Sequence, residues 1–358
     1  MRLLYWLYVL RALAFHKLLR YARHEGERTR HSAPALLWDA GMALLFHDVH
    51  PSDYFCLHFP DRPKSEVKTH ANTLFMRRFH RRCNARHARG VFQDKLQFLE
   101  TFSDFTKRSH VIISKDDRET FRQWLLRHRP AEIIVKTPFG TCGLGVMKLL
   151  LNYDPEPQLM PDQKAFDDFS SDLVAKGFGL AEECLVQHAE LAMLNPSSVN
   201  TIRLVTILDS KCNPHILAAV LRVGVGKSVD NFHAGGIAIL VDLETGMTKG
   251  SGFRMEPSDE EYFERHPLTQ VRLTDCTIPY WREILLMVKE AAELVPGVGT
   301  VGWDVAVTPS GPCLIEGNDN WDKTIVEKAL GRGIRQDLER FLSKAPTRNA
   351  TVSPPPES

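Results

Sequence analysis

Hydrophobic and polar positions change their spacing repeatedly along the chain, which predicts helices alternating with strands from about residue 90 onward. Apolar residues at helical spacing predict helices over 93–102, 119–130, 161–179, 279–296 and 322–344. Short β-branched and apolar runs predict strands over 110–114, 180–188, 199–209, 215–226 and 235–246. Residues 132–151 combine a strand, a glycine-rich loop and a second strand. We therefore expect an α+β fold with two lobes, each a sheet with helices.

A β-hairpin is predicted in GWDVAVTPSGPCLIEGNDN, residues 302–320. Apolar and polar residues alternate over 301–308, and Pro309-Ser310-Gly311 suits a three-residue loop. A loop centred on Ser310 places Asp304 opposite Glu316, with Asn318 on the same face. In that register the Cβ atoms of the two carboxylate residues lie roughly 5 Å apart.

The facing carboxylates need an explanation, because like charges directly opposite each other destabilise a sheet. Three converging side chains with oxygen atoms favour a bound cation, since the motif holds no lysine or arginine. Oxygen ligands alone suit Mg²⁺ or Mn²⁺ better than zinc. A solvent-facing hairpin with hydrated carboxylates explains the same pattern, and the hairpin alone leaves both interpretations open.

The first 90 residues are predicted to be mainly helical and carry many basic residues. In the first 27 residues, apolar side chains recur at helical spacing beside Arg11, Lys17, Arg20 and Arg23. A basic, aromatic-rich amphipathic helix can lie on an anionic membrane surface. A helix docked on the protein's own core fits the same pattern. Peripheral membrane contact is therefore one of two hypotheses for this region.

The length of 358 residues predicts several units rather than one small domain. We expect an N-terminal region over 1–90, a first lobe over 91–188, a second lobe over 189–344 and a disordered Pro/Ser-rich tail over 345–358. The net charge of +1 gives no global reason to expect nucleic-acid binding. The seven dispersed cysteines contain no C-x-x-C pair, which argues against a disulfide framework or zinc site. Such cysteine usage predicts a reducing, cytoplasmic setting.

The loop in VKTPFGTCGLGV, within 135–146, has the composition of a phosphate-binding turn. Gly140, Gly143 and Gly145 allow backbone N–H groups to approach anionic oxygens without hindrance from a Cβ atom. Lys136 on the preceding strand can place a positive charge against phosphate, and Lys95 is a second candidate cation. The motif is neither a P-loop nor a dinucleotide fingerprint, and an ordinary glycine-rich turn also fits it.

The strand LAEECLVQH, 180–188, can present main-chain groups to an adenine edge between two lobes. Glu183 and Leu185 have the spacing to do so through their backbones, and Glu190 is the nearest acidic residue for the ribose hydroxyls. An ordinary strand between lobes is the alternative.

Two arginines, Arg203 and Arg222, occupy predicted strands, where a charge usually needs a partner. Asn231 lies on a neighbouring loop bounded by glycines. Positive charges beside the acidic hairpin suit a phosphate-bearing ligand that carries its own metal. The alternative is that these residues are ordinary surface charges on exposed strand faces.

In this order, the motifs resemble the ATP-grasp superfamily over roughly residues 90–340. The resemblance is carried by QDK (93–95), IIVKTPFGTCGLGV (133–146), AEECLV (181–186), NFHAGG (231–236) and GWDVAVTPSGPCLIEGN (302–318). SSVNTIRLVT, DNFHAGGIAILVDLETG and LIEGNDNWD are most similar to its sugar-transfer-associated branch, related to the α-L-glutamate ligases. Many relatives carry an arginine two residues before the first metal-binding aspartate, where this chain has Gly302. Arg203 or Arg222 could supply that charge.

The resemblance implies that Lys95 and Lys136 contact ATP phosphates under the loop 138–146. It also implies that the segment from Glu182 to Leu185 holds adenine. In the same way, two Mg²⁺ ions are expected on three residues of the hairpin: Asp304, Glu316 and Asn318.

The activity implied by the resemblance is an ATP-dependent carboxylate–amine ligase acting through an acylphosphate. Its substrates would be a small-molecule carboxylate and an amine, with polysaccharide or peptide precursors suggested by the name of the branch. A kinase on the same scaffold and a non-catalytic, nucleotide-binding partner of polysaccharide assembly are the alternatives.

Overall fold

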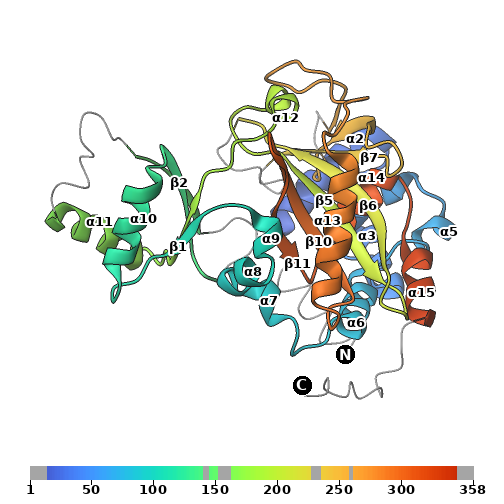
Figure 1. Cartoon of the computed structure of the whole chain (residues 1–358). Helices are drawn as coiled ribbons and strands as arrows, with labels where there is room; N and C mark the ends of the chain where they lie inside the picture. The colour runs from blue at the N-terminus through green and yellow to red at the C-terminus, as the bar shows by residue number, and fades with distance from the viewer. Residues whose placement is uncertain (1–13, 140–144, 152–162, 227–234, 258–260, 345–358) are drawn as a thin grey trace.

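The computed structural model describes residues 14–139, 145–151, 163–226, 235–257 and 261–344. Its strands form two separate sheets, one of four strands and one of seven. Figure 1 shows the small sheet with α10 and α11 set to one side of the larger lobe. The α+β class and the two sheet-bearing lobes agree with the sequence-based expectation.

The smaller sheet has the order β1-β4-β2-β3, and its strand pairs are all antiparallel. Its strands are β1 (His110–Ile112), β2 (Glu132–Lys136), β3 (Val146–Leu150) and β4 (Leu180–Glu183). Two helices, α10 (Arg118–His128) and α11 (Gln163–Ala175), share its hydrophobic core. Phe121 and Phe166 from these helices pack with Ile133 and Val135 from the sheet. The glycine-rich segment connects β2 to β3, as predicted.

The larger sheet has the order β11-β10-β5-β6-β7-β8-β9. Its strands are β5 (Thr201–Leu208), β6 (Pro214–Val223), β7 (Ile237–Val241), β8 (Thr248–Phe253), β9 (Tyr262–Phe263), β10 (Thr300–Thr308) and β11 (Gly311–Asn318). The hairpin β10–β11 therefore forms one edge, and β10 pairs on its other side with β5. This order places Asp304 directly beside Arg203.

One face of the larger sheet packs against α13 (Trp281–Leu294) and three short helices that precede the small lobe in sequence. These are α7 (Gly90–Gln93), α8 (Lys95–Thr101) and α9 (Ser103–Thr106). Phe98 and Phe102 join the core around Trp303, and the Phe102 and Trp303 ring centroids lie 5.4 Å apart. Lys95 is therefore held by an element of the larger lobe. A further helix, α12 (Ala189–Leu194), follows the small sheet.

The opposite face is covered by the N-terminal helices together with the two C-terminal ones. They are α2 (Phe15–Thr29), α3 (Ala33–His47), α4 (Pro51–Cys56), η1 (Phe59–Asp61), α5 (Lys64–Val67), α6 (Thr73–Cys83), α14 (Lys323–Leu330) and α15 (Arg335–Lys344). Phe55 and Phe79 share this core with Val205, Val220 and Ile325. The predicted helical character is confirmed, and the described part of the first helix docks on the core through Leu18 and Tyr21. Among described residues, no helix has both the length and the apolar character needed to cross a bilayer.

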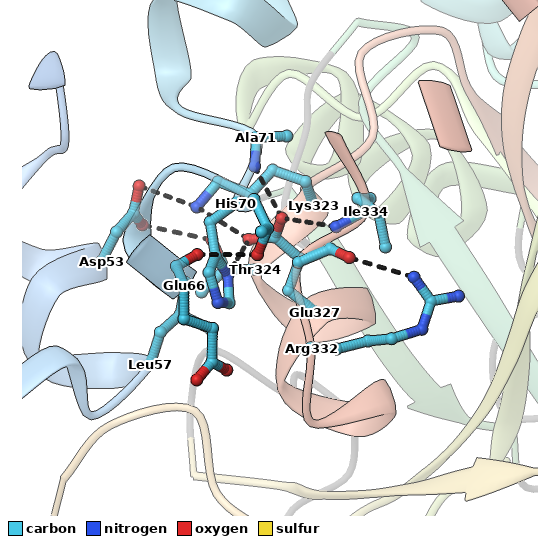
Figure 2. A network of polar contacts seen from close by, with 12 residues as sticks. Asp53, Leu57, Glu66, His70, Ala71, Lys323, Thr324, Glu327, Arg332 and Ile334 are labelled. Atoms are coloured by element: carbon cyan, nitrogen blue, oxygen red, sulfur yellow. Dashed lines mark hydrogen bonds and ion pairs between the residues drawn. The ribbon is translucent and has the colours of Figure 1, made fainter. Parts of the chain in front are cut away.

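Two buried polar networks attach the N-terminal helices to the rest of the chain. In Figure 2, Lys323 lies 2.8 Å from Asp53, and Glu327 accepts hydrogen bonds from the amides of Ala71 (2.7 Å) and Ile334 (3.2 Å). The second network centres on His58, which contacts Glu25 at 2.6 Å and Glu261 at 2.7 Å.

The prediction of one helix over 322–344 is wrong. Gly331 caps α14 with a φ of 66°, a left-handed conformation that ends the helix, and α15 begins at Arg335. Strands β8 and β9 were not predicted, because glycines interrupt the first and the second has only two residues. The predicted disordered tail, 345–358, lies outside the described residues.

Candidate active site

The hairpin β10–β11 pairs Asp304 with Glu316, as predicted, and Gly302 with Asn318. The loop differs from the prediction. Thr308 pairs with Gly311, which leaves a two-residue loop instead of three. A register shift after Asp304 then leaves Ile315 as an extra residue in β11. This β-bulge restores the predicted pairing of Asp304 with Glu316, and it thereby sets the orientation of the Glu316 side chain.

Asp304 is buried and held by both candidate arginines. Arg203 donates from Nε to Oδ1 at 2.5 Å and from Nη2 to Oδ2 at 2.9 Å, and Arg222 Nη2 lies 2.9 Å from Oδ2. Burial would raise the pKa of Asp304, but the two arginines lower it to about 2. Arg222 also donates to Thr201 Oγ1. The structure thus brings together three predicted residues from β5, β6 and β10.

The Gly302 position cannot hold the arginine that many relatives carry there. A Cβ atom added at Gly302 would lie 2.7 Å from Cβ of Trp321, a distance that ordinary packing does not allow. The Cβ atom added at Gly302 would also lie 3.3 Å from Cδ of Arg203, which occupies the neighbouring space on β5. The positive charge beside Asp304 comes from the two strand arginines, Arg203 and Arg222.

Glu316 lies on the edge strand β11, and its pKa shifts in the opposite direction from that of Asp304. Desolvation by the surrounding protein and the facing Asp304 carboxylate raise its pKa. Asn318 Nδ2 donates to Glu316 Oε1 at 3.2 Å. In the described part of the chain, no three His, Cys, Asp or Glu residues cluster as a metal site. The donor set of two carboxylates and an amide oxygen nevertheless fits a hard divalent cation, which would relieve the repulsion at Glu316.

A narrow cavity of about 50 Å³ joins the two hairpins. Five predicted residues line it: Lys95, Lys136, Glu182, Glu316 and Asn318. Lys136 Nζ lies 2.6 Å from Glu182 Oε2, and Lys95 Nζ donates to the carbonyl of Thr137 at 2.8 Å. Desolvation, followed by the charge of Lys136, lowers the pKa of Lys95. An anion bound between the two lysines would reduce this repulsion.

Arg108 is the site residue that sequence reasoning missed. Its guanidinium is buried between the lobes and donates from Nε to Glu182 Oε2 at 2.8 Å. It also donates to the carbonyls of Leu314 (2.5 Å) and Ile315 (3.2 Å), beside the bulge in β11. Although burial opposes ionisation, Lys136 and Arg108 lower the pKa of Glu182 to about 2. Arg108 thus connects Glu182, the partner of Lys136, to Ile315, the residue before Glu316.

The predicted adenine-binding segment begins in the middle of the small sheet. Because β4 lies between β1 and β2, the Glu183 amide already donates to the Ser109 carbonyl at 2.9 Å. Leu185 lies just beyond the strand, and Glu190 is exposed in the first turn of α12.

The glycine-rich loop is described only at its ends. Gly145 adopts a φ of 72°, and its carbonyl accepts from the Thr137 amide at 2.9 Å. An added Cβ there would lie 2.5 Å from Thr137 Oγ1, which explains the glycine. Gly140, Gly143 and Asn231 fall outside the described residues.

Two α+β lobes with a shared cavity lined by Lys95 from α8, Lys136 from β2 and Glu316 from the hairpin β10–β11 have the architecture of an ATP-grasp protein. The chain belongs to the sugar-transfer associated ATP-grasp family, whose sequence model matches residues 74–342. The family and fold predicted from the sequence are confirmed.

Solved structures with similar folds are distant in sequence. One is an N5-carboxyaminoimidazole ribonucleotide synthetase in its ADP complex, with 10% identity, a TM-score of 0.39 and coverage of 66% of this chain and 46% of that chain. Another is the ATP-grasp ligase PsnB with minimal precursor, Mg and ADP, with 13% identity, a TM-score of 0.42 and coverage of 73% and 61%. A third is the VanG D-Ala:D-Ser ligase from Enterococcus faecalis, with 11% identity, a TM-score of 0.42 and coverage of 72% and 62%. The matched region spans about half to three-fifths of those chains, and no curated protein matches this sequence.

Proposed function

We propose that the protein is an ATP- and Mg²⁺-dependent ligase that joins a carboxylate to an amine through an acylphosphate. The observation that carries this proposal is the shared cavity. Lys95 from α8 and Lys136 from β2 line it together with Glu316 and Asn318 from β11. Cations for phosphate and oxygen donors for a metal thus line the same cavity, which suits a metal–nucleotide complex.

Each part of the nucleotide has candidate partners. Lys95 and Lys136 would bind the phosphates, and the segment from Glu182 to Leu185 would bind adenine through the groups that the sheet leaves available. Glu190 is the candidate for the ribose hydroxyls. Three residues would hold the cation through their oxygens, with Mn²⁺ as a substitute for Mg²⁺: Asp304, Glu316 and Asn318.

The reaction would begin when a substrate carboxylate oxygen attacks the γ-phosphorus of ATP. The bond to the β–γ bridging oxygen breaks, ADP leaves, and an amine then displaces phosphate from the acylphosphate. Because two anions must meet in the first step, its barrier is largely electrostatic. Arg203 and Arg222 are placed to orient Asp304 and to offset negative charge there. The bound divalent cation would supply charge neutralisation of the phosphates.

The substrate class is suggested by the family description, sugar-transfer associated ATP-grasp. We propose a sugar acid or amino-acid precursor of a cell-surface polymer as the carboxylate. A cytoplasmic setting, where ATP is available, would suit such a reaction.

The test is ADP release by the full chain with pooled sugar acids, amino acids and amines. The proposal requires ADP release that depends on Mg²⁺, a carboxylate and an amine, and that Glu316→Gln reduces strongly. Glu290→Gln, an exposed residue on α13, is the matched control. A phosphorylated product that forms and persists without amine would instead show a kinase. Retained turnover in Glu316→Gln would refute the assigned metal site.

A further inference from the structure

The outward face of α3 is apolar along its whole length. Helical geometry places seven residues on the side opposite the buried Leu36, Ala40, Ala43 and Leu44. They are Pro34, Ala35, Trp38, Gly41, Met42, Leu45 and Phe46. Trp38, Leu45 and Phe46 are 72%, 44% and 64% exposed. Asp39, at the margin of this face, accepts a hydrogen bond from Tyr54 Oη at 2.5 Å.

A surface helix normally carries charged residues on its outer side, and a helix that is apolar all round is normally buried on all sides. In α3 only one side has a partner in the described chain, which is the N-terminal core. Scattered exposed apolar residues are ordinary, but a continuous row of them along one helix marks an interaction surface.

The sequence before α3 also carries apolar residues that lack an obvious place in the core. Residues 30–32 join α2 to α3, and the two helices pack against each other as an αα-hairpin. The start of α2 and the end of α3 therefore lie at the same end of the pair. Phe15, the first residue of α2, is 65% exposed. The 13 residues before the described chain, MRLLYWLYVLRAL, contain only Arg2 and Arg11 as charged side chains.

These observations favour a lipid surface over a protein partner. If residues 1–13 covered the face of α3, their own apolar side chains would still need a cover, because nearly all of them are apolar or aromatic. A second copy of the chain on this face would likewise leave apolar side chains of residues 1–13 without a cover. A bilayer can cover both, and tryptophan, tyrosine and arginine suit its interface. Arg23 is exposed on α2 and Arg30 is exposed just after its end, which suits anionic headgroups.

We propose that the outer face of α3, led by Trp38 and Phe46, docks the protein on an anionic membrane surface without crossing it. This membrane contact is independent of the proposed ligase activity. It would hold the protein at a membrane surface, whatever its carboxylate substrate.

Co-flotation of the full chain with vesicles tests the proposal. Vesicles of phosphatidylcholine alone are compared with vesicles that also contain phosphatidylglycerol. Wild type is expected to float with the anionic vesicles, and the double variant Trp38→Ser/Phe46→Ser to lose about tenfold or more of its vesicle partitioning. The matched control is Leu286→Ser/Leu294→Ser on α13, where both leucines are at least half exposed. This control should float like wild type.

Leu45→Ser gives a second, milder variant of the same face, with a smaller expected loss, should the double variant not fold. Equal flotation of wild type and both α3 variants would overturn the proposal, as would no flotation of wild type. Sedimentation without lipid identifies the main rival. A wild-type dimer that the α3 variants convert to monomer, with no vesicle binding, would make this face an interface between copies and refute the membrane assignment.

Discussion

Neutralising Glu316 is expected to stabilise the protein while weakening its function. Glu316 and Asp304 face each other across β10 and β11. At about 5 Å, two unit charges repel by roughly 1–3 kcal/mol for effective dielectric constants of about 80 to 20. Arg203 and Arg222 offset part of this repulsion through Asp304. We therefore expect Glu316→Gln to raise the free energy of unfolding by about 1 kcal/mol without metal, which is roughly 1–3 °C in Tm.

The pH dependence follows from the raised pKa of Glu316. A carboxyl whose pKa is higher in the folded state binds its proton more readily there. Wild type therefore loses stability as pH rises from the ordinary glutamate value, about 4.3, through the raised value. The advantage of Glu316→Gln should be absent near pH 4 and reach its full size once Glu316 is ionised. Thermal melts of both proteins in metal-free buffer from about pH 4 to pH 8 measure this difference.

Added Mg²⁺ should raise the Tm of wild type and change that of Glu316→Gln little, because the second carboxylate is then missing. Glu290→Gln on α13 controls for the loss of one surface charge and should behave like wild type. A lower Tm for Glu316→Gln in metal-free buffer would refute the reasoning. It would show that Glu316 is held by favourable contacts rather than strained by its neighbour.

Three further changes test other parts of the structure. Arg108→Lys loses the hydrogen bonds to the β11 carbonyls, so the free energy of unfolding should fall by roughly 2–3 kcal/mol, as measured by thermal melts. The affinity for ATP should fall as well. Lys136→Met should lower ATP affinity about tenfold or more by calorimetry, because a charge-assisted phosphate contact is lost. His58→Gln tests the network in which His58 contacts Glu25 of α2 and Glu261. Burial opposes protonation of His58, but the two carboxylates raise its pKa. That stabilisation is complete below about pH 6.5 and is lost as pH rises through the raised value, so the Tm gap between wild type and variant should shrink at alkaline pH.

Each of these variants has a surface control of the same chemistry. The controls are Arg127→Lys, Lys289→Met and His87→Gln, all at exposed residues. Unchanged stability in Arg108→Lys would show that the link between the lobes is not carried by its guanidinium. ATP binding as tight in Lys136→Met as in wild type would remove that lysine from the phosphate site. A Tm gap for His58→Gln that widens with pH would contradict the sign of the linkage.

The sequence predicts most of the fold and the centre of the site, because both depend on local periodicity. Alternation over 301–308 and a turn at Pro309 were enough to place Asp304 opposite Glu316. The tighter loop and the bulge at Ile315 were not predictable, since each shifts the register by one residue and the two shifts cancel. The correct pair was thus reached through an incorrect loop.

Other features depend on contacts between distant segments and leave no local pattern. Arg108 sits between a short helix and a strand, and only the folded chain brings it to Leu314 and Glu182. The break at Gly331 was missed because both halves of 322–344 keep helical periodicity. The sequence of α3 is typical of a buried helix, because composition alone does not distinguish a helix buried on all sides from one with an exposed apolar face.

The most direct test of the site is calorimetric titration of ATP into the full chain, with and without Mg²⁺. Binding is expected with Mg²⁺, and it should weaken strongly when the metal is removed or when Glu316 is replaced by Gln. ATP binding that is the same with and without Mg²⁺, and the same in Glu316→Gln as in wild type, would contradict a metal–nucleotide site at this hairpin.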